Sequence, residues 1–371
     1  MSAETEVARG GTAAPDGPTL GGAQSSAQAI ELIMAIVRVL LPVALALVVG
    51  ALILLAFGKD PLAYYGYVVQ RGLLSPSGLQ ATITRIAPLL LIAAGLIVAF
   101  RAGIWNLGVD GQFLLAAVST AALAPVLNDI LPGGLMVLVC FLVASAVAAL
   151  WSLLPALLKV RYGINEIVTT LMMSFLGISF ANVLVKIPFN DPTTTVPQTA
   201  TLAVEDRLPR LFDSTVHSGV VIALLLVILV HLMMTRTAFG LKLQVVGANP
   251  AAAVHAGLNV AWLTVATFTL SAALIGLGGS VEILGVFGTV RADWNPAFGL
   301  LVVPLVFLAR FNGYAVIGFT LFFSALMIGG DSAARRIGVP QHFVLVLVAL
   351  LLIFLAVVEY LDHQRRKRIG A

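Results

Sequence analysis

The chain has 371 residues, of which 60% are hydrophobic and only 10% are charged, and its mean hydropathy is +1.05. Soluble globular domains carry about 25% charged residues, so this composition argues against a water-soluble enzyme. Apolar stretches long enough to cross the ~30 Å hydrocarbon core, at about 20 residues each, recur along the chain. They are apolar on every face, unlike the alternating strands of a membrane β-barrel. The sequence therefore predicts an all-α polytopic membrane protein.

The polar residues exclude several kinds of site. The single cysteine, Cys140, lies in an apolar run and allows neither an internal disulfide nor a cysteine metal cluster. The five histidines show no metal-ligand spacing, so no metal site is predicted. The net charge of +4 comes from positive residues in short loops and a tail between apolar runs. That distribution is typical of membrane orientation and gives no support to nucleic-acid binding.

The first part of the chain is predicted to lie outside the membrane. Residues 1–32 are rich in small and polar residues and in proline, which predicts a disordered cytoplasmic tail. This tail has no basic start followed at once by a short apolar core, so it is not interpreted as a cleaved signal peptide. The first apolar run, 33–57, is therefore expected to be a retained membrane helix, and it opens a transmembrane domain over 33–361.

Nine further spans are predicted, which makes about ten in all. They are 80–100, 108–127, 133–158, 165–186, 217–235, 260–286, 296–309, 313–330 and 339–361. The stretch after Arg101 is interrupted by glycines and polar residues, which indicates a broken segment. The span 296–309 is short and suits a re-entrant segment, which is tolerated where neighbouring helices bury its backbone.

Ten crossings place both termini on one side of the membrane. The basic tail 362–371 contains Arg365, Arg366, Lys367 and Arg368 directly after the last span, which indicates that this side is cytoplasmic. The longest connection, about 187–216, then lies outside. The sequence therefore predicts a multi-pass protein surrounded by membrane lipids.

No motif for ATP binding or catalysis is present. The nearest candidate for a phosphate loop, Gly58–Lys59–Asp60, lacks the upstream glycine and has Asp where Ser or Thr must hold the metal ion. The small residues at 276–279 lie inside an apolar span and predict close helix–helix packing. We therefore expect a protein that is not an enzyme and binds no cofactor. If it moves a solute against a gradient, its energy must come from another protein.

The connection 236–259 specifies a short helix between two spans. Asn249 is a good N-cap, and Pro250 suits the first helical position. Ala252 and Ala253 favour helix, and Gly257 is able to end it in the left-handed conformation. A helix of about two turns is marginal in water by itself. It is expected either to lie on the membrane surface or, as we favour, to dock on a partner.

Three segments resemble one transporter family. They are the loop Thr237–Leu258, the run Phe100–Gln112 (FRAGIWNLGVDGQ) and the run Gly163–Met172 (GINEIVTTLM). The second is similar to the Phe-Arg-Ala-Gly-(apolar)-(aromatic)-Asn-(apolar)-Gly-x-acidic-Gly-Gln signature of ABC importer permeases of the simple-sugar and nucleoside branch, which includes ribose permeases. The resemblance covers about residues 80–360. It departs at Asp110, where Glu is usual, and at Gln244, where Arg is usual.

The resemblance implies a location in the bacterial cytoplasmic (inner) membrane, several partners and a coupling site. A separate ABC ATPase subunit would use ATP, a second permease, identical or paralogous, would complete the pathway, and an extracytoplasmic binding protein would deliver the substrate. Six residues are assigned to ATPase coupling by this resemblance: Gly247, Asn249, Pro250, Ala252, Ala253 and Gly257. The substrate expected from the resemblance is a nucleoside or a simple sugar, with nucleosides preferred.

Polar residues in or near the spans are candidates for the translocation pathway. Asp110 is a functional candidate because an ionisable group in a span is costly, with pairing to Arg101 as the favoured structural interpretation. Asn106 and Gln112 either satisfy freed backbone groups or line the pathway. Glu282 either reaches outward or lines the cavity, and we favour the cavity.

Four further residues have an interfacial position. Trp294 and Asn295 are expected near an interface, where tryptophan settles, and are candidates for contact with a sugar or base. Asn165 and Glu166 open a span at the predicted cytoplasmic mouth. Capping and interaction with the helix dipole are their simplest role, and a gating contact is the alternative.

A second class of function also fits the membrane carboxylates. Asp110, Glu166 and Glu282 are possible relay groups of a proton- or sodium-coupled secondary transporter. This alternative explains neither the short helix in the connection 236–259 nor the three matched segments.

Overall fold

The computed structural model describes residues 40–340 and 343–369. The predicted tail 1–32, the start of the first predicted span and the last two residues of the basic tail lie outside the described residues. In the described part, seven helices are long and apolar enough to cross a membrane. They are α3 (Pro76–Arg101), α4 (Val109–Asn128), α5 (Gly133–Tyr162), α6 (Glu166–Lys186), α7 (Gly219–Arg236), α10 (Val260–Glu282) with the π-helical turn η3 (Ile283–Phe287), and α12 (Gly313–Ile337).

Shorter helices complete the chain. The apolar ones are Leu40–Ala56, α8 (Ala238–Ala248), α11 (Phe298–Leu308) and the first part, Phe343–Val358, of α13 (Phe343–Ile369). The others are α2 (Pro61–Val69) with the π-helical turn η1 (Gln70–Leu74), α9 (Pro250–His255) and the 3-10 turn η2 (Val204–Asp206). These helices confirm the all-α polytopic fold.

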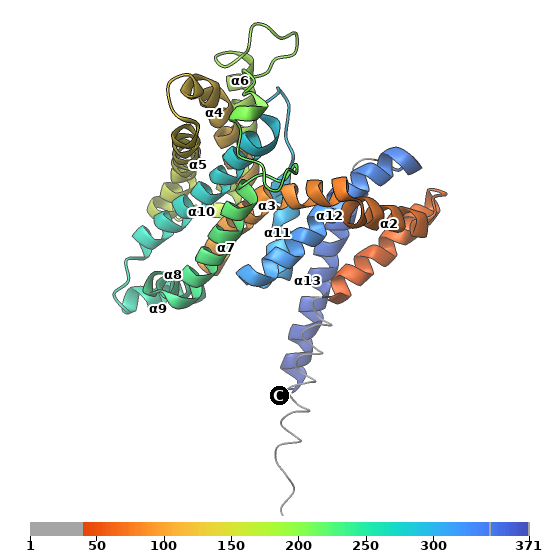
Figure 1. Cartoon of the computed structure of the whole chain (residues 1–371). Coiled ribbons are helices and arrows are strands. Elements are labelled where there is room, and N and C mark those ends of the chain that lie inside the picture. The colour runs from red at the N-terminus through yellow and green to blue at the C-terminus, as the bar shows by residue number, and fades with distance from the viewer. Residues whose placement is uncertain (1–39, 341–342, 370–371) are drawn as a thin grey trace, which may run out of the picture.

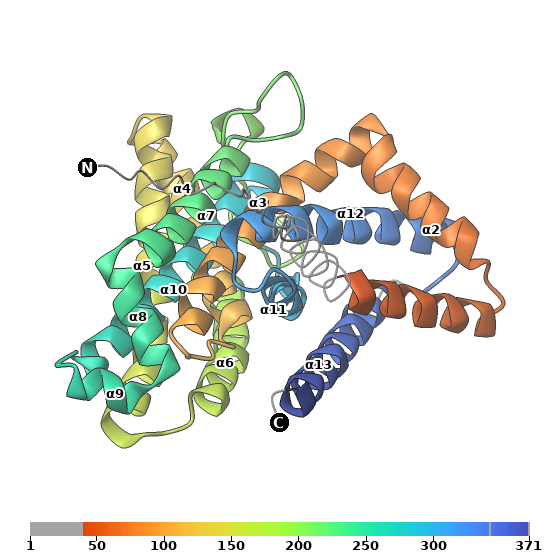
Figure 2. The same ribbon diagram turned by 90° about the horizontal axis from the view of Figure 1, so that it is seen from below.

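The helices form two groups that share α3. Figures 1 and 2 show α4 to α10 on one side and α2, α12 and α13 on the other, with α11 between them. In the first group, α10 packs against α3, α4 and α5. The small residues predicted to pack closely do so, since a Cβ on Gly276 would lie 2.6 Å from the carbonyl oxygen of Ala144 in α5. In the second group, α12 packs against α2 and α3.

The predicted short span 296–309 contains α11, which has only 11 residues. At 1.5 Å per residue, that helix is roughly 16 Å long, about half of the hydrocarbon core. Its side chains Leu301, Val302 and Leu305 are fully buried. Figure 1 shows extended chain leading from the end of α10 to α11. The segment is therefore partly exposed irregular backbone followed by a half-length helix with one buried side.

Three local elements differ from the sequence prediction. Residues 61–74 form α2 and η1, although only a connection was expected there. Asp60 starts α2, since its side chain accepts a 2.8 Å hydrogen bond from the Leu62 backbone N–H. The connection 236–259 contains α8 as well as the predicted short helix. At the C-terminus, α13 continues as helix through most of the basic tail, to Ile369.

Candidate functional site

The predicted short helix is present as α9, and its local causes are those read from the sequence. The Asn249 side chain accepts a 3.0 Å hydrogen bond from the Ala252 backbone N–H, and Pro250 occupies the first turn. Gly257 follows the helix with a φ of +77°, a conformation that residues with a Cβ rarely adopt. Capping and termination are therefore encoded within nine residues of sequence.

Helix α8 was not predicted from the sequence, although Thr237 is a residue type that often caps the start of a helix. The Thr237 side chain accepts a 3.2 Å hydrogen bond from the Gly240 backbone N–H and so caps α8. At the other side of the helix, Gln244 donates to the backbone carbonyl of Met234 in α7. These contacts hold α8 folded back against α7, and α9 continues from it. The coupling segment, defined here as α8 and α9 together, is thus a helix pair rather than a loop with one helix.

The coupling segment projects from one end of the molecule, at the lower left of Figure 1. On α9, Ala253 is fully buried whereas Ala251 and Ala252 are exposed. The Val254 side chain is 60% exposed, which leaves an apolar group in solvent on a preformed helix. Val254 is therefore accessible to a partner that docks on this helix.

A close backbone contact joins the coupling segment to the segment between α3 and α4. Gly247 lies near the C-terminus of α8, and a Cβ there would lie 2.6 Å from the carbonyl oxygen of Arg101. Gly103, with a φ of +68°, faces it, and a Cβ on Gly103 would lie 2.9 Å from the Cα of Gly247. Two glycines therefore permit two backbones to touch at the start of the 102–108 segment.

That 102–108 segment is held by a buried polar network. The Asn106 amide nitrogen donates to Gln112 Oε1 at 3.1 Å and to Ser271 Oγ in α10 at 3.0 Å. Gln112 returns a 3.0 Å hydrogen bond to Asn106 Oδ1, which also accepts from the Gly108 backbone N–H. Both side chains are at most 1% exposed. Of the two roles predicted for them, satisfying freed backbone and neighbouring groups is the one that this structure displays.

Asp110 braces the broken segment, but through a different partner from the one expected. Its Oδ1 accepts a 2.8 Å hydrogen bond from the Gly299 backbone N–H, in the first turn of α11. Arg101 instead donates to the backbone carbonyl of Phe311 at 3.2 Å. The predicted Asp110–Arg101 pair is therefore wrong. The N-cap position of α11, Ala297, has no side-chain acceptor, so a carboxylate from α4 caps α11 from outside.

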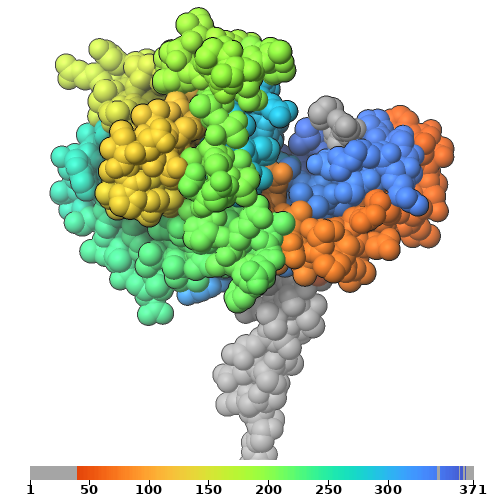
Figure 3. All heavy atoms as spheres, turned by 45° about the horizontal axis from the view of Figure 1, so that its top comes forward, coloured from red at the N-terminus to blue at the C-terminus, as the bar shows by residue number. Residues whose placement is uncertain are grey.

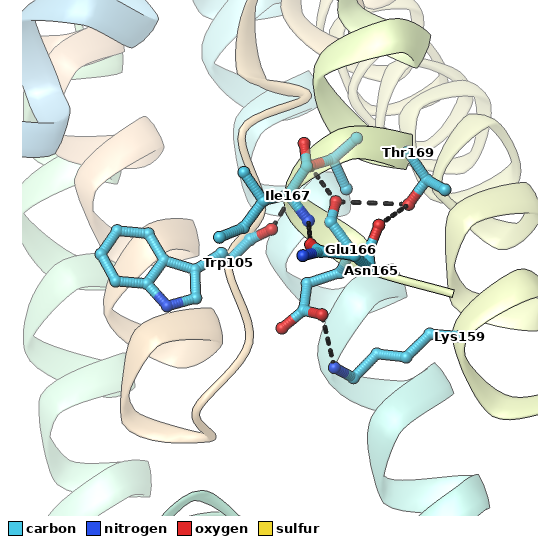
Figure 4. A network of polar contacts seen from close by, with 7 residues as sticks. Trp105, Lys159, Asn165, Glu166, Ile167 and Thr169 are labelled. Carbon is cyan, nitrogen blue, oxygen red and sulfur yellow. Dashed lines mark hydrogen bonds and ion pairs between the residues drawn. The ribbon is translucent and has the colours of Figure 1, made fainter. Parts of the chain in front are cut away.

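Asn165 and Glu166 lie at the start of α6, and Figure 4 shows Glu166 beside Lys159. The Asn165 side chain accepts a 2.8 Å hydrogen bond from the Ile167 backbone N–H, which is the predicted cap of α6. Glu166 forms a 2.7 Å ion pair with Lys159 at the end of α5. Thr170 then links α6 to the 102–108 segment, since its Oγ1 accepts from the Leu107 backbone N–H at 3.1 Å.

Glu282, Trp294 and Asn295 lie toward the opposite end. Glu282 is 1% exposed and forms a 2.9 Å ion pair with Arg85 of α3. Trp294 packs its ring against Phe113 and Phe287, and Asn295 accepts from the Ala297 backbone N–H. The six predicted pathway residues therefore do not form one cluster. Asn106 and Gln112 are joined to each other, whereas Glu282 pairs with Arg85, which lies over Phe298 at the start of α11.

The comparisons with known proteins decide the family. Residues 78–356 match the family described as the permease component of branched-chain amino acid transport systems. The chain belongs to this family. It is 32% identical over 341 residues to the glucose ABC transporter permease protein TsgB13 of Haloferax volcanii, covering 89% of this chain and 88% of that protein.

Two further relatives have related names. The chain is 27% identical to the nucleoside ABC transporter permease protein NupB of Lactococcus lactis, with coverage of 86% of this chain and 90% of the relative. It is 26% identical to the guanosine ABC transporter permease protein NupP of Bacillus subtilis, with coverage of 85% and 92%. These matches confirm the predicted resemblance, and the chain is a multi-pass permease subunit of an ABC transport system.

Family membership also bears on the energy source and partners. A permease of this family works with a separate ATPase subunit and a substrate-binding protein. The comparisons therefore favour the ABC permease over a secondary transporter. The three carboxylates proposed as a relay each have a local partner of their own, as described above: Gly299, Lys159 and Arg85.

Proposed function

We propose that this chain forms the pathway of an ATP-driven importer and carries a nucleoside or a simple sugar across the cytoplasmic membrane. It acts together with a second permease copy or paralogue. The end that bears α9 faces the cytoplasm, where the two ATPase subunits bind and use ATP, and both termini lie on that side. The binding protein delivers the substrate at the opposite end. Relatives named for glucose and for nucleosides support this substrate class.

One observation carries the coupling role: an exposed, preformed helix whose support touches the backbone at the break between two spans. α9 needs no ordering before it docks, because Asn249 and Gly257 already fix its ends. Movement of the ATPase displaces α9 and α8 together. The Gly247–Gly103 contact passes that displacement to the 102–108 segment, and the Asn106 network passes it on to α4 and α10.

The cytoplasmic mouth lies on the same route. Leu107 is bonded to Thr170 of α6, and Glu166 of α6 is paired with Lys159 of α5. A shift of the 102–108 segment therefore pulls on the first turn of α6. We assign Asn165 and Glu166 to the mouth on this basis, with the Glu166–Lys159 pair as the contact that changes between access states.

The experiment replaces Val254 with aspartate in the assembled transporter. Val254 is exposed, so Val254→Asp leaves the fold intact and places a charge in the docking surface. We expect loss of ATPase association and of ATP-driven uptake, with normal membrane insertion. Phe212→Asp is the matched control for ATPase association, because Phe212 is 96% exposed in the loop at the opposite end, away from the ATPase. Normal uptake by the Val254 variant contradicts the coupling role.

Deletion of 249–257, or Gly257→Pro, tests the same role more severely. Proline requires a φ near −65°, whereas Gly257 has a φ of +77°, so the end of α9 cannot form. We expect the protein to insert without binding the ATPase. Collapse of the proton gradient with ATP retained separates this mechanism from a secondary transporter, since only the latter stops directly.

A further inference from the structure

The end opposite α9 contains a polar cavity that the coupling route does not use. It has a volume of about 240 Å³ and lies between α3, α12, the end of α10 and the loop that precedes α7. The lining residues are Ala81, Thr84, Arg85, Arg210, Thr215, Glu282, Gly285, Val286 and Ile328. Figure 3 shows the surface hollowed between the loop, in green, and α12, in blue.

The charged groups of this cavity are incompletely satisfied. Arg85 Nη1 donates to Glu282 Oε1 at 2.9 Å, but Glu282 Oε2 is buried without a hydrogen-bond partner in the described part of the chain. A buried polar atom in a native protein normally has a partner. Arg210 is exposed at the rim, and its side chain makes no hydrogen bond or ion pair that involves the described residues. The cavity therefore presents a free acceptor and free donors side by side.

The position of these groups is fixed by contacts from two directions. Arg85 lies over the ring of Phe298, with its Cζ 5.4 Å from the ring centroid. The loop is tied to α3, because Gln80 Oε1 accepts from the backbone N–H and the hydroxyl of Thr215 at 3.2 and 3.1 Å. A site held in this way loses little freedom when a ligand binds.

The geometry points to a neutral, polyhydroxylated ring, and we propose that this cavity is a subsite for the sugar moiety of the transported substrate. A hydroxyl group both donates and accepts, so neighbouring hydroxyls bridge the Glu282 carboxylate and the guanidinium groups of Arg85 and Arg210. The inference rests on the proposed function and extends it by naming the recognised part of the substrate.

Size and wall chemistry support a sugar over a base. Sites for drug-sized ligands start at about 300 Å³, so a volume of about 240 Å³ suits a single small ring. The apolar wall consists of Ala81, Gly285, Val286 and Ile328, and no described lining residue is aromatic. Bases are usually recognised by stacking on aromatic rings, which this wall does not offer.

A neighbouring cavity gives room for the rest of a larger substrate. It has a volume of about 660 Å³ and shares Ala81 and Ile328 with the smaller one. It lies between η1, the start of α3 and the last turns of α12, with Tyr67, Arg71 and Arg335 among its lining residues. When a sugar ring occupies the smaller cavity, the rest of a larger substrate has room to extend into the neighbouring one.

The test uses protection of a single cysteine in the full-length protein in lipid nanodiscs. The buried Cys140 is first replaced by alanine, and Thr84→Cys then places a thiol in the cavity. Labelling by N-ethylmaleimide is followed with D-glucose or D-ribose present. At a sugar concentration about ten times its dissociation constant, mass action slows labelling roughly tenfold. Ala81→Cys is a second probe if the first variant does not insert.

Two controls make the result specific. Thr195→Cys places a thiol on the exposed loop away from the cavity, and its labelling should be unaffected by sugar. Adding Glu282→Gln to the Thr84→Cys protein should abolish protection. No protection by either sugar, equal slowing at position 195, or protection that survives the Glu282 change overturns the inference. Protection by inorganic phosphate alone shows an anion site and also overturns it.

This experiment is independent of the coupling test. If ATP-driven uptake depends on α9 but sugars give no protection, the subsite fails and the proposed function stands. If sugars protect the cysteine but uptake does not need the ATPase, the subsite stands and the proposed function fails.

Discussion

The contact between Gly247 and the segment after α3 gives the most direct test of the coupling route. In a Gly247→Ala protein the new Cβ would lie 2.6 Å from the Arg101 carbonyl oxygen and 2.7 Å from the Ala102 carbonyl carbon. Both are backbone atoms, so neither can turn aside as a side chain does. Ordinary van der Waals contacts of a Cβ begin at about 3.4 Å, so the two backbones must separate.

The change in stability caused by Gly247→Ala is the sum of two opposing effects. Overpacking by one carbon costs about 1–3 kcal/mol, whereas replacing glycine by alanine in a helix gains up to about 1 kcal/mol. Gly318 in α12 provides the matched control, because nothing lies within 4 Å of a Cβ built there. Gly318→Ala is therefore expected to gain helix stability without a cost of overpacking. We expect Gly247→Ala to be less stable than Gly318→Ala by about 1–3 kcal/mol.

Two measurements check this expectation. Unfolding of each purified variant in detergent gives the difference in stability, and uptake by the assembled transporter gives the effect on coupling. We expect the Gly247 variant to bind the ATPase and to transport slowly, because α9 is intact but its support has moved. A Gly247→Ala protein that is as stable as Gly318→Ala and transports at the parental rate refutes the argument that this backbone contact carries the motion.

Three further outcomes are expected. Burial of His217, whose ring nitrogens have no partner among the described residues, lowers its pKa to about 4. The folded protein therefore favours the neutral imidazole, so the free energy of unfolding should fall by roughly 3 kcal/mol as the pH drops from about 6.5 to about 4. Unfolding measured over a pH series should show this fall, and the His217→Phe protein should lack it. Asp110→Ala should lower the free energy of unfolding by about 1–2 kcal/mol, because the Gly299 N–H loses its acceptor, and Asp110→Asn should lower it by less. Equal stability of the parent, Asp110→Ala and Asp110→Asn proteins contradicts the capping role. Lys159→Met should change stability by less than about 1 kcal/mol, since the pair with Glu166 is partly exposed, but should alter the uptake rate if that pair marks the mouth.

Local features could be predicted from the sequence because their causes are local. Asn249, Pro250 and Gly257 fix α9 through capping and backbone preference, and these effects act within a few residues. The long apolar spans follow from the length of each apolar run. The helix α8 escaped prediction because its start signal, Thr237, lies in a segment that reads equally well as a loop.

The site chemistry depended on the tertiary structure. The carboxylate of Asp110 accepts from a residue 189 positions away, and Arg85 and Glu282 are 197 positions apart. No spacing rule joins such residues, because helix packing alone decides which faces meet. For that reason the composition and the matched segments established a membrane permease, whereas only the packed helices showed that Asp110 caps α11 rather than pairing with Arg101. The packed helices likewise revealed the Gly103–Gly247 contact.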